Sequence, residues 1–222
     1  MKKIMFNDKY GLTQAVLSGR KTMTRRIITC PKEFKGEWVA GFYVYKRQSD
    51  NAIIQYPCMY DADECAFDGG EILPKYKVGE VVAIAQSYRD VVQGGYPIDS
   101  RYDAFRTANW GDGEDGALKG SAGWTNKMFV RADLMPHHIR ITDVKVERLQ
   151  DISNDDCLRE GVLSSDKYAM PYGIPDSKAP NKVFFYYSSP REAFAALIDK
   201  VSGKGVWDSN PWVFVYEFIL ID

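Results

Sequence analysis

The sequence predicts an α+β fold, a small mixed β-barrel with flanking short helices and two insertions. Residues 81–85 are apolar on both faces, which is typical of a buried strand. Between residues 138 and 149 the apolar alternation changes phase near Thr142, which predicts the kind of bulge that turns a barrel corner. The closing run, residues 212–221, is apolar on both faces apart from Glu217 and predicts a central strand.

Three short helices are expected from their capping residues. The first has apolar residues at helical spacing from Leu12 and ends at Gly19, where glycine suits a left-handed cap. The second opens at Ser153 and closes at Gly161, and the third opens at Ser189. The apolar stripe of the third helix is explained by core packing; it consists of Phe194, Leu197, Ile198 and Val201.

Two segments do not fit the core pattern. Residues 31–75 contain two β-like runs, 42–45 and 53–56, on either side of a polar turn at 49–51, so we expect a hairpin insertion. Residues 90–126 form an acidic, glycine-rich excursion that is too long for a plain connection. We interpret this excursion as either a mobile lid or a disordered loop.

Composition sets the broad class. A chain of 222 residues with 45% hydrophobic residues can bury a full core, and we interpret residues 1–222 as one domain. The net charge of −1 argues against a protein that coats nucleic acid over a large basic surface. There is no apolar run of about 18 residues and no signal-peptide core, so we expect a cytoplasmic protein without a membrane partner. The four cysteines lack CxxC spacing, so free thiols are expected, with no metal and no cofactor.

The most informative motif is residues 19–26, GRKTMTRR, which follows the first helix. It brings four cations and two hydroxyls together, and the first 30 residues hold seven basic side chains against the single acid Asp8. Guanidinium groups match phosphate or carboxylate oxygens, and a crowded lysine can lose its proton and act as a base. The motif therefore indicates an anionic or nucleobase-like ligand; the alternative is a solvated surface turn.

At this point the chain resembles the ASCH domain family, a group with a PUA-like small β-barrel. It is most similar to the longer ASCH proteins of phages and bacterial genomes. The segments that carry the resemblance are 19–26 (GRKTMTRR), 78–82 (VGEVV), 135–136 (MP) with 146–149 (VERL), 157–161 (CLREG) and 210–218 (NPWVFVYEF).

The resemblance implies a cleft between the barrel and its flanking helices that holds RNA or a modified nucleoside. Some small family members resemble amidohydrolases that remove an acyl group from N4-acetylated cytidine. Transferred by motif position, their lysine, nucleophilic threonine and glutamate fall on Lys21, Thr24 and Glu160. Further candidate ligand-binding residues are Arg20, Thr22, Arg25, Arg26, Tyr88, Trp212 and Glu217.

This chemistry is physically consistent. A threonine hydroxyl becomes a nucleophile when a neighbour takes its proton, and a lysine whose pKa is lowered by burial and by nearby arginines can do so. Glu160 could orient Lys21 or pass a proton to the leaving amine, although a surface acid is the plain alternative. Lys21 and Thr24 would face opposite ways in an unbroken strand, so we expect irregular backbone between them. Glu217 is either a counter-ion for Lys21 or Arg26 or a solvent-facing residue at the barrel edge.

Two departures from the family pattern limit the comparison. Residues 85–88 read AQSY where the longer relatives have Arg-Glu-Thr-Trp, so any role of that acid is absent or neutral here. His137 and His138 would point to opposite sides of a strand and are not expected to form a metal pair.

Three functions remain. The first is a module that binds RNA, a nucleotide or a modified nucleoside in a basic cleft without turning it over. The second is an amidohydrolase that deacylates N4-acetylcytidine-like nucleosides through Lys21, Thr24 and Glu160. The third is a protein-binding accessory factor of a mobile element.

Overall fold

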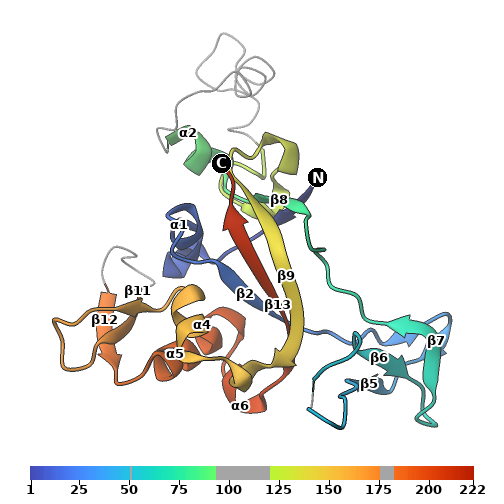
Figure 1. The fold of residues 1–222 in the computed structure, drawn as a ribbon. Coiled ribbons are helices and arrows are strands. Elements are labelled where there is room, and N and C mark those ends of the chain that lie inside the picture. The colour runs from blue at the N-terminus through green and yellow to red at the C-terminus, as the bar shows by residue number, and fades with distance from the viewer. Residues whose placement is uncertain (51, 94–120, 176–182) are drawn as a thin grey trace.

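A computed structural model describes residues 1–50, 52–93, 121–175 and 183–222, and its centre is a five-stranded sheet (Figure 1). The strand order is β1 (Lys2–Ile4), β8 (Val81–Ile84), β9 (His138–Arg148), β13 (Trp212–Leu220) and β2 (Met23–Ile27). β1 and β8 are parallel and the other pairs are antiparallel. The predicted strands at 81–85 and 212–221 are confirmed, and the apolar β13 is central because it pairs on both sides.

The expected bulge in β9 is present. Glu217 pairs with Asp143, whereas the next residue of β13, Phe218, pairs with Ile141, so Thr142 is the extra residue of β9. One additional residue reverses the phase of the alternation. Consequently the apolar residues before and after the bulge share one face of the sheet; they are Ile139, Ile141, Val144 and Val146.

The expected closure into a barrel is not found. Within the described residues the sheet is open, with β1 and β2 as its edges, and no ladder joins them. β1 has only three residues, and the chain then turns into a 3-10 helix at Asp8–Tyr10, so it offers too little strand to pair with β2. Instead, the Arg26 guanidinium donates a hydrogen bond to the Met5 carbonyl, at 2.6 Å. The fold is therefore a mixed α+β fold with an open sheet.

The predicted helices are confirmed with their caps. α1 (Leu12–Leu17), α4 (Asn154–Arg159) and α5 (Pro190–Ser202) are followed closely by glycines with positive φ, and α6 (Val206–Ser209) comes after α5. The side chains of Ser153 and Ser189 accept hydrogen bonds from the backbone N–H groups of Asp156 and Glu192. Such caps satisfy helix N–H groups that have no intrahelical partner.

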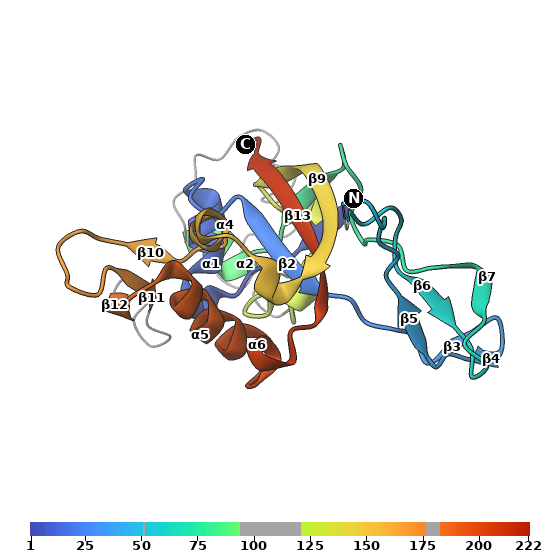
Figure 2. The ribbon, with the colours of Figure 1, turned by 60° about the horizontal axis from the view of Figure 1, so that its bottom comes forward.

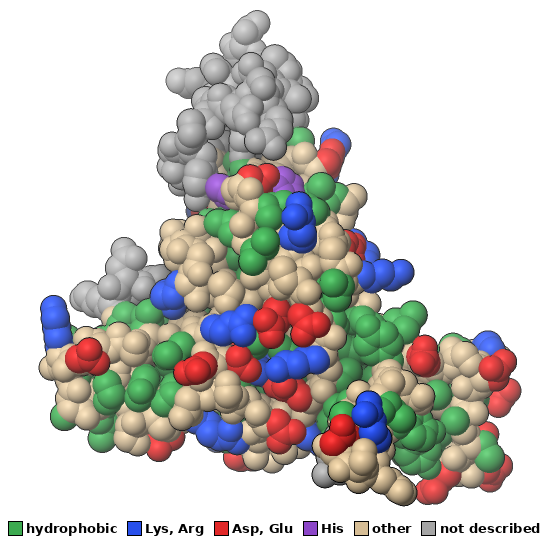
Figure 3. Space-filling model, in the orientation of Figure 1, with side chains coloured by type: hydrophobic (Ala, Val, Ile, Leu, Met, Phe, Trp, Pro, Cys, Tyr) green, Lys and Arg blue, Asp and Glu red, His purple; other side chains and the backbone are tan. Residues whose placement is uncertain are grey.

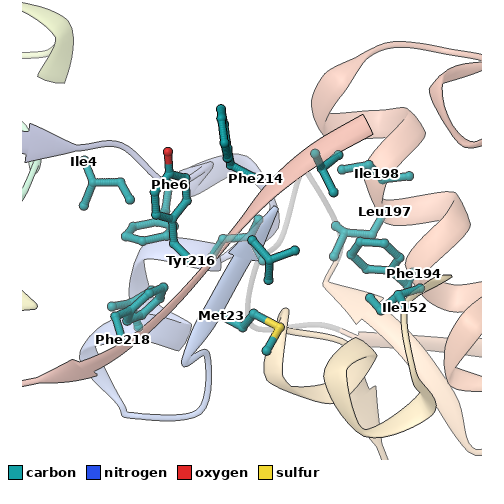
Figure 4. Packing of buried hydrophobic residues seen from close by; sticks show 14 of the residues in the cluster. Ile4, Phe6, Met23, Ile152, Phe194, Leu197, Ile198, Phe214, Tyr216 and Phe218 are labelled. Atoms are coloured by element: carbon teal, nitrogen blue, oxygen red, sulfur yellow. The ribbon is translucent and has the colours of Figure 1, made fainter. Parts of the chain in front are cut away.

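The core lies on both faces of β13 (Figure 4). Phe6, Tyr216 and Phe218 lie on one side of the strand, and Phe194, Leu197 and Ile198 of α5 lie on the other. α5 therefore covers one face of the sheet beside β2.

The predicted hairpin insertion is a pair of small sheets. β3 (Glu33–Phe34) pairs with β4 (Glu37–Trp38), and β5 (Gly41–Tyr43), β6 (Cys58–Tyr60) and β7 (Ala66–Glu71) form a second sheet. The predicted second arm, 53–56, contributes one bridge, Lys46 to Ile53, because the main pairing is with residues 58–60. This insertion and the sheet of β10 (Leu163–Ser164), β11 (Tyr172–Pro175) and β12 (Val183–Tyr187) extend from opposite sides of the central sheet (Figure 2).

The second predicted insertion, 90–126, lies largely outside the described residues. Its described ends include the last residues of α2 (Tyr88–Gln93), and short 3-10 helices follow at Lys127–Phe129, Ala132–Leu134 and Leu149–Asp151. In the described parts of the chain, none of the helices has the length and apolar character needed to cross a bilayer.

Deleting Thr142 should leave the sheet intact, because Ile141 and Asp143 would then follow one another in regular alternation opposite Phe218 and Glu217. Deleting Lys145, which is paired with Val215, should instead turn Val146 away from the apolar face. We expect the Lys145 deletion to unfold at a much lower denaturant concentration than the Thr142 deletion. Equilibrium unfolding followed by circular dichroism measures both, and equal losses in the two variants would contradict the assigned bulge.

Candidate functional site

Lys21 is held by irregular backbone between α1 and β2, as the sequence predicts. Gly19 has φ of 71°, and β2 begins only at Met23. The Lys21 N–H donates to the Ala15 carbonyl at 2.8 Å, and the Thr22 N–H donates to the Arg159 carbonyl at 3.0 Å. These bonds tie the segment to both α1 and α4. They turn the Lys21 side chain inward, where the residue is only 2% exposed.

Glu160 receives the buried ammonium group. Lys21 Nζ lies 2.6 Å from Glu160 Oε2 and donates a second bond of 2.7 Å to the Glu160 carbonyl. Glu160 caps the C-terminal end of α4 and is 4% exposed. The two alternatives, a solvated basic turn and a surface acid, are therefore wrong for these two residues. The unfavourable position of an acid at a helix C-terminus is offset by direct contact with cations.

Arg25 is the second cation on this carboxylate, and its side chain has no exposed surface. Its guanidinium lies 3.1 Å from Glu160 Oε1, 2.6 Å from Glu147 and 3.2 Å from Asp156. Lys145 adds a further contact of 3.2 Å to Glu147. On the surface of the molecule, basic and acidic side chains are also interspersed over the middle of the face shown in Figure 3. Arg25 is thus neutralised by three acids and is not free to bind a phosphate.

The electrostatic environment changes the proton affinity of Lys21. Burial lowers its pKa below the ordinary value of 10.5, Glu160 opposes this change, and Arg26 and Arg25 lower the pKa further. This agrees with the expectation of a lysine perturbed by burial and arginines. Arg20 does not take part, because it lies at the surface and its guanidinium donates to the Gly161 carbonyl at 3.0 Å.

A cavity of about 270 Å³ opens on this group. Its polar lining residues are Asn7, Lys21, Thr24, Arg25, Arg26, Glu160 and Ser202. Because β2 is the sheet edge, side chains from both of its faces reach the cavity. Within the described residues the Thr24 hydroxyl makes no hydrogen bond, to Lys21 or to any other group, so it is available to a ligand.

The apolar wall was not predicted. The apolar lining residues include Phe6, Leu12 and, from α5, Phe194, Leu197, Ile198 and Val201. The sequence analysis assigned the α5 stripe to the core alone, and the side chains of Phe194 and Leu197 do belong to the core as well. A helix that lines a cavity and a helix that packs in the core have the same apolar periodicity. The sequence pattern of α5 therefore cannot distinguish the two roles.

The remaining predicted residues lie outside the cavity. Glu217 has Arg159 as its partner, at 2.7 Å, so the expected pairing with Lys21 or Arg26 is wrong. Its side chain is 27% exposed, so the solvent-facing alternative holds in part. Arg159 also donates to the Thr22 hydroxyl at 3.1 Å. The sequence analysis did not identify Arg159 as the residue that joins Glu217 to Thr22, because a local pattern does not show which acid an arginine will contact.

Two aromatic candidates are also elsewhere. Tyr88 is buried in a separate cluster with Val91, and its hydroxyl accepts the Arg131 N–H at 2.9 Å. Trp212 stacks under Arg148, whose guanidinium carbon is 4.3 Å from the ring centroid. The structure brings neither ring to the Lys21 cavity.

The described residues include no group of three or more His, Cys, Asp or Glu side chains suited to a metal ion. His138 lies 3.0 Å from the Asp222 carboxylate. Comparisons with protein-family models, curated proteins and solved structures gave no match to this chain.

Arg25→Ala should destabilise the protein by about 3–5 kcal/mol, because it leaves the buried carboxylate of Glu160 and the partly buried carboxylates of Glu147 and Asp156 without their shared cation. Arg26→Ala, which removes an exposed guanidinium from the next position, should cost less than about 1 kcal/mol. Urea denaturation of both variants measures the difference. If both lose the same small amount, the Arg25 cluster does not stabilise the fold as described.

Proposed function

We propose that the protein is an amidohydrolase that removes an acyl group from a small N4-acetylcytidine-like nucleoside. The observation that carries this proposal is that Lys21, Thr24 and Glu160 line one cavity, with the lysine buried against the glutamate. The ASCH-like, PUA-related fold is part of the same proposal. It is supported by the fact that two of the motif segments, 19–26 and 157–161, meet at this cavity.

Each residue has a defined role in the proposed reaction. The Thr24 oxygen attacks the acyl carbonyl while its proton passes to the neutral amine of Lys21. The Lys21 ammonium then protonates the leaving amine of the base, and water hydrolyses the resulting acyl-threonine ester with Lys21 again as the base. Glu160 holds the lysine nitrogen in place, and Arg25 fixes the other oxygen of that carboxylate.

The charge balance favours a small ligand over an RNA backbone as the main contact. Lys21 and Arg25 are occupied by carboxylates, which leaves Arg26 as the cation of the cavity wall without a carboxylate partner among the described residues. The volume of about 270 Å³ is just below the range of about 300–1,000 Å³ typical of sites for drug-sized ligands. Its apolar wall suits a planar base.

The second candidate function is binding of RNA or a nucleotide without turnover. Arg20 and Arg26 favour it, because both are exposed cations whose hydrogen-bond partners in the described part of the chain are backbone carbonyls. It predicts salt-dependent RNA binding that Arg26→Ala weakens, and no release of cytidine from N4-acetylcytidine.

Thr24→Val should abolish deacylation, because valine keeps the shape of threonine and removes its hydroxyl. Thr24→Ser keeps the hydroxyl and should retain activity, whereas Lys21→Ala should reduce the rate by at least about 100-fold. Release of cytidine from N4-acetylcytidine, followed by liquid chromatography, measures all three. Full activity of Thr24→Val would exclude threonine as the nucleophile.

The rate of deacylation should rise with pH and level off below pH 10.5, since only the neutral amine accepts a proton and burial lowers the pKa of Lys21 from 10.5. A pH series of kcat/KM measures this rise. Lys21→Arg provides the control, because a guanidinium stays protonated and should be inactive throughout the series. A rate that is independent of pH in wild type would contradict a lysine base.

A further inference from the structure

A second cavity of about 330 Å³ adjoins the first at the open seam between β1 and β2. Three residues, Met5, Arg26 and Ile27, line both cavities. The other lining residues are Lys3, Ile28, Thr29, Ile72, Leu73, Lys75 and Tyr76, with Phe214 and Tyr216 of β13. A ligand in the Lys21 cavity would reach this second space by passing Arg26, whose hydrogen bond to Met5 lies at the shared wall.

The second cavity differs from the first in its charged lining, because the first includes the carboxylate of Glu160. Lys3, Arg26 and Lys75 line it, and no Asp or Glu does so in the described part of the chain. None of the three cations forms an ion pair with another described residue. Lys3 donates to the carbonyls of Met128 and Val130, and Arg26 donates to that of Met5. Three positive charges without a carboxylate attract an anion, and phosphate oxygens suit both lysine and arginine.

The same cavity has a fixed aromatic wall. The rings of Tyr76 and Tyr216 meet edge to face, 5.3 Å apart. The Tyr76 hydroxyl donates to the Lys3 carbonyl, and the Tyr216 hydroxyl accepts the Lys75 N–H, so both rings are held in place. Burial raises the pKa of Tyr76 to about 12, which keeps its phenol neutral near pH 7 and adds no negative charge to the site. Aromatic rings beside cations are typical of sites for a base with its phosphate.

We propose that this second cavity binds a phosphate ester attached to the nucleoside that occupies the first, so that the ligand is a nucleotide or a short oligonucleotide and not a free nucleoside. The proposal rests on the proposed function, because it takes the Lys21 cavity as the site of the base. Lys75 is the specific cation of the second cavity, since Arg26 is shared and Lys3 is bound to two carbonyls.

Calorimetric titration with cytidine, cytidine 3′-monophosphate, cytidine 5′-monophosphate and a cytidine-containing trinucleotide tests the proposal. We expect at least one phosphate-bearing ligand to bind about tenfold more tightly than cytidine. Lys75→Gln should remove most of that advantage. Lys77→Gln is the matched control, because Lys77 is an exposed lysine two positions away that does not line the cavity, and it should keep the advantage. A mononucleotide that binds as well as the trinucleotide indicates a phosphomonoester; a trinucleotide that alone binds tightly indicates a chain.

Equal affinity of wild type for cytidine and for all three phosphate-bearing ligands would overturn the second site, and so would equal losses in Lys75→Gln and Lys77→Gln. Turnover of N4-acetylcytidine, measured on the same preparations, separates this failure from that of the proposed function. Turnover without a phosphate advantage overturns only the second site. A phosphate advantage lost in Lys75→Gln but without turnover supports the second site and overturns only the hydrolase.

Discussion

The Glu160 carboxylate, shared by two buried cations, is the interaction on which the rest of the structure depends. One oxygen contacts Lys21 at 2.6 Å and the other contacts Arg25 at 3.1 Å, and all three residues are almost fully buried. Burying any one of these charges alone would be costly. The network therefore requires β2, the end of α4 and, through Glu147, β9 to meet at one point. Segments more than 120 residues apart in sequence are fixed together in this way.

This network also divides the cations of the 19–26 motif into two groups. Lys21 and Arg25 are turned inward and neutralised, while Arg20 and Arg26 stay exposed with carbonyl partners. The motif is one basic cluster in the sequence, but in the fold its cations form one buried pair and one exposed pair. The inner pair forms part of the polar wall of the first cavity, and the outer cations lie at the surface without a carboxylate partner among the described residues.

Local patterns predicted the parts of the fold that depend on local physics. Strand alternation and helix capping act within a few residues, so the local sequence predicted them. The features predicted in this way are the phase change at Thr142, the caps of α4 and α5, and the glycine after α1. The inward position of Lys21 followed from the motif resemblance. The partner of Glu217 and the burial of Arg25 were not predictable, because any of several arginines and acids satisfies the same pattern and only the tertiary fold selects among them. The prediction of a closed barrel was wrong for a different reason. β1 has only three residues, and strand propensity does not define where a strand ends.

The open sheet and the site have a common origin. A strand inside a closed barrel shows one face to the core and the other to solvent or a helix, so Thr24 and Arg25 would serve different surfaces. At an open edge, side chains from both faces of β2 reach the same space, which is why Thr24, Arg25 and Arg26 all line the first cavity. The seam left by the short β1 then gives room for a second cavity beyond Arg26. A longer β1 that paired with β2 would close the barrel and fill the space where both cavities now meet.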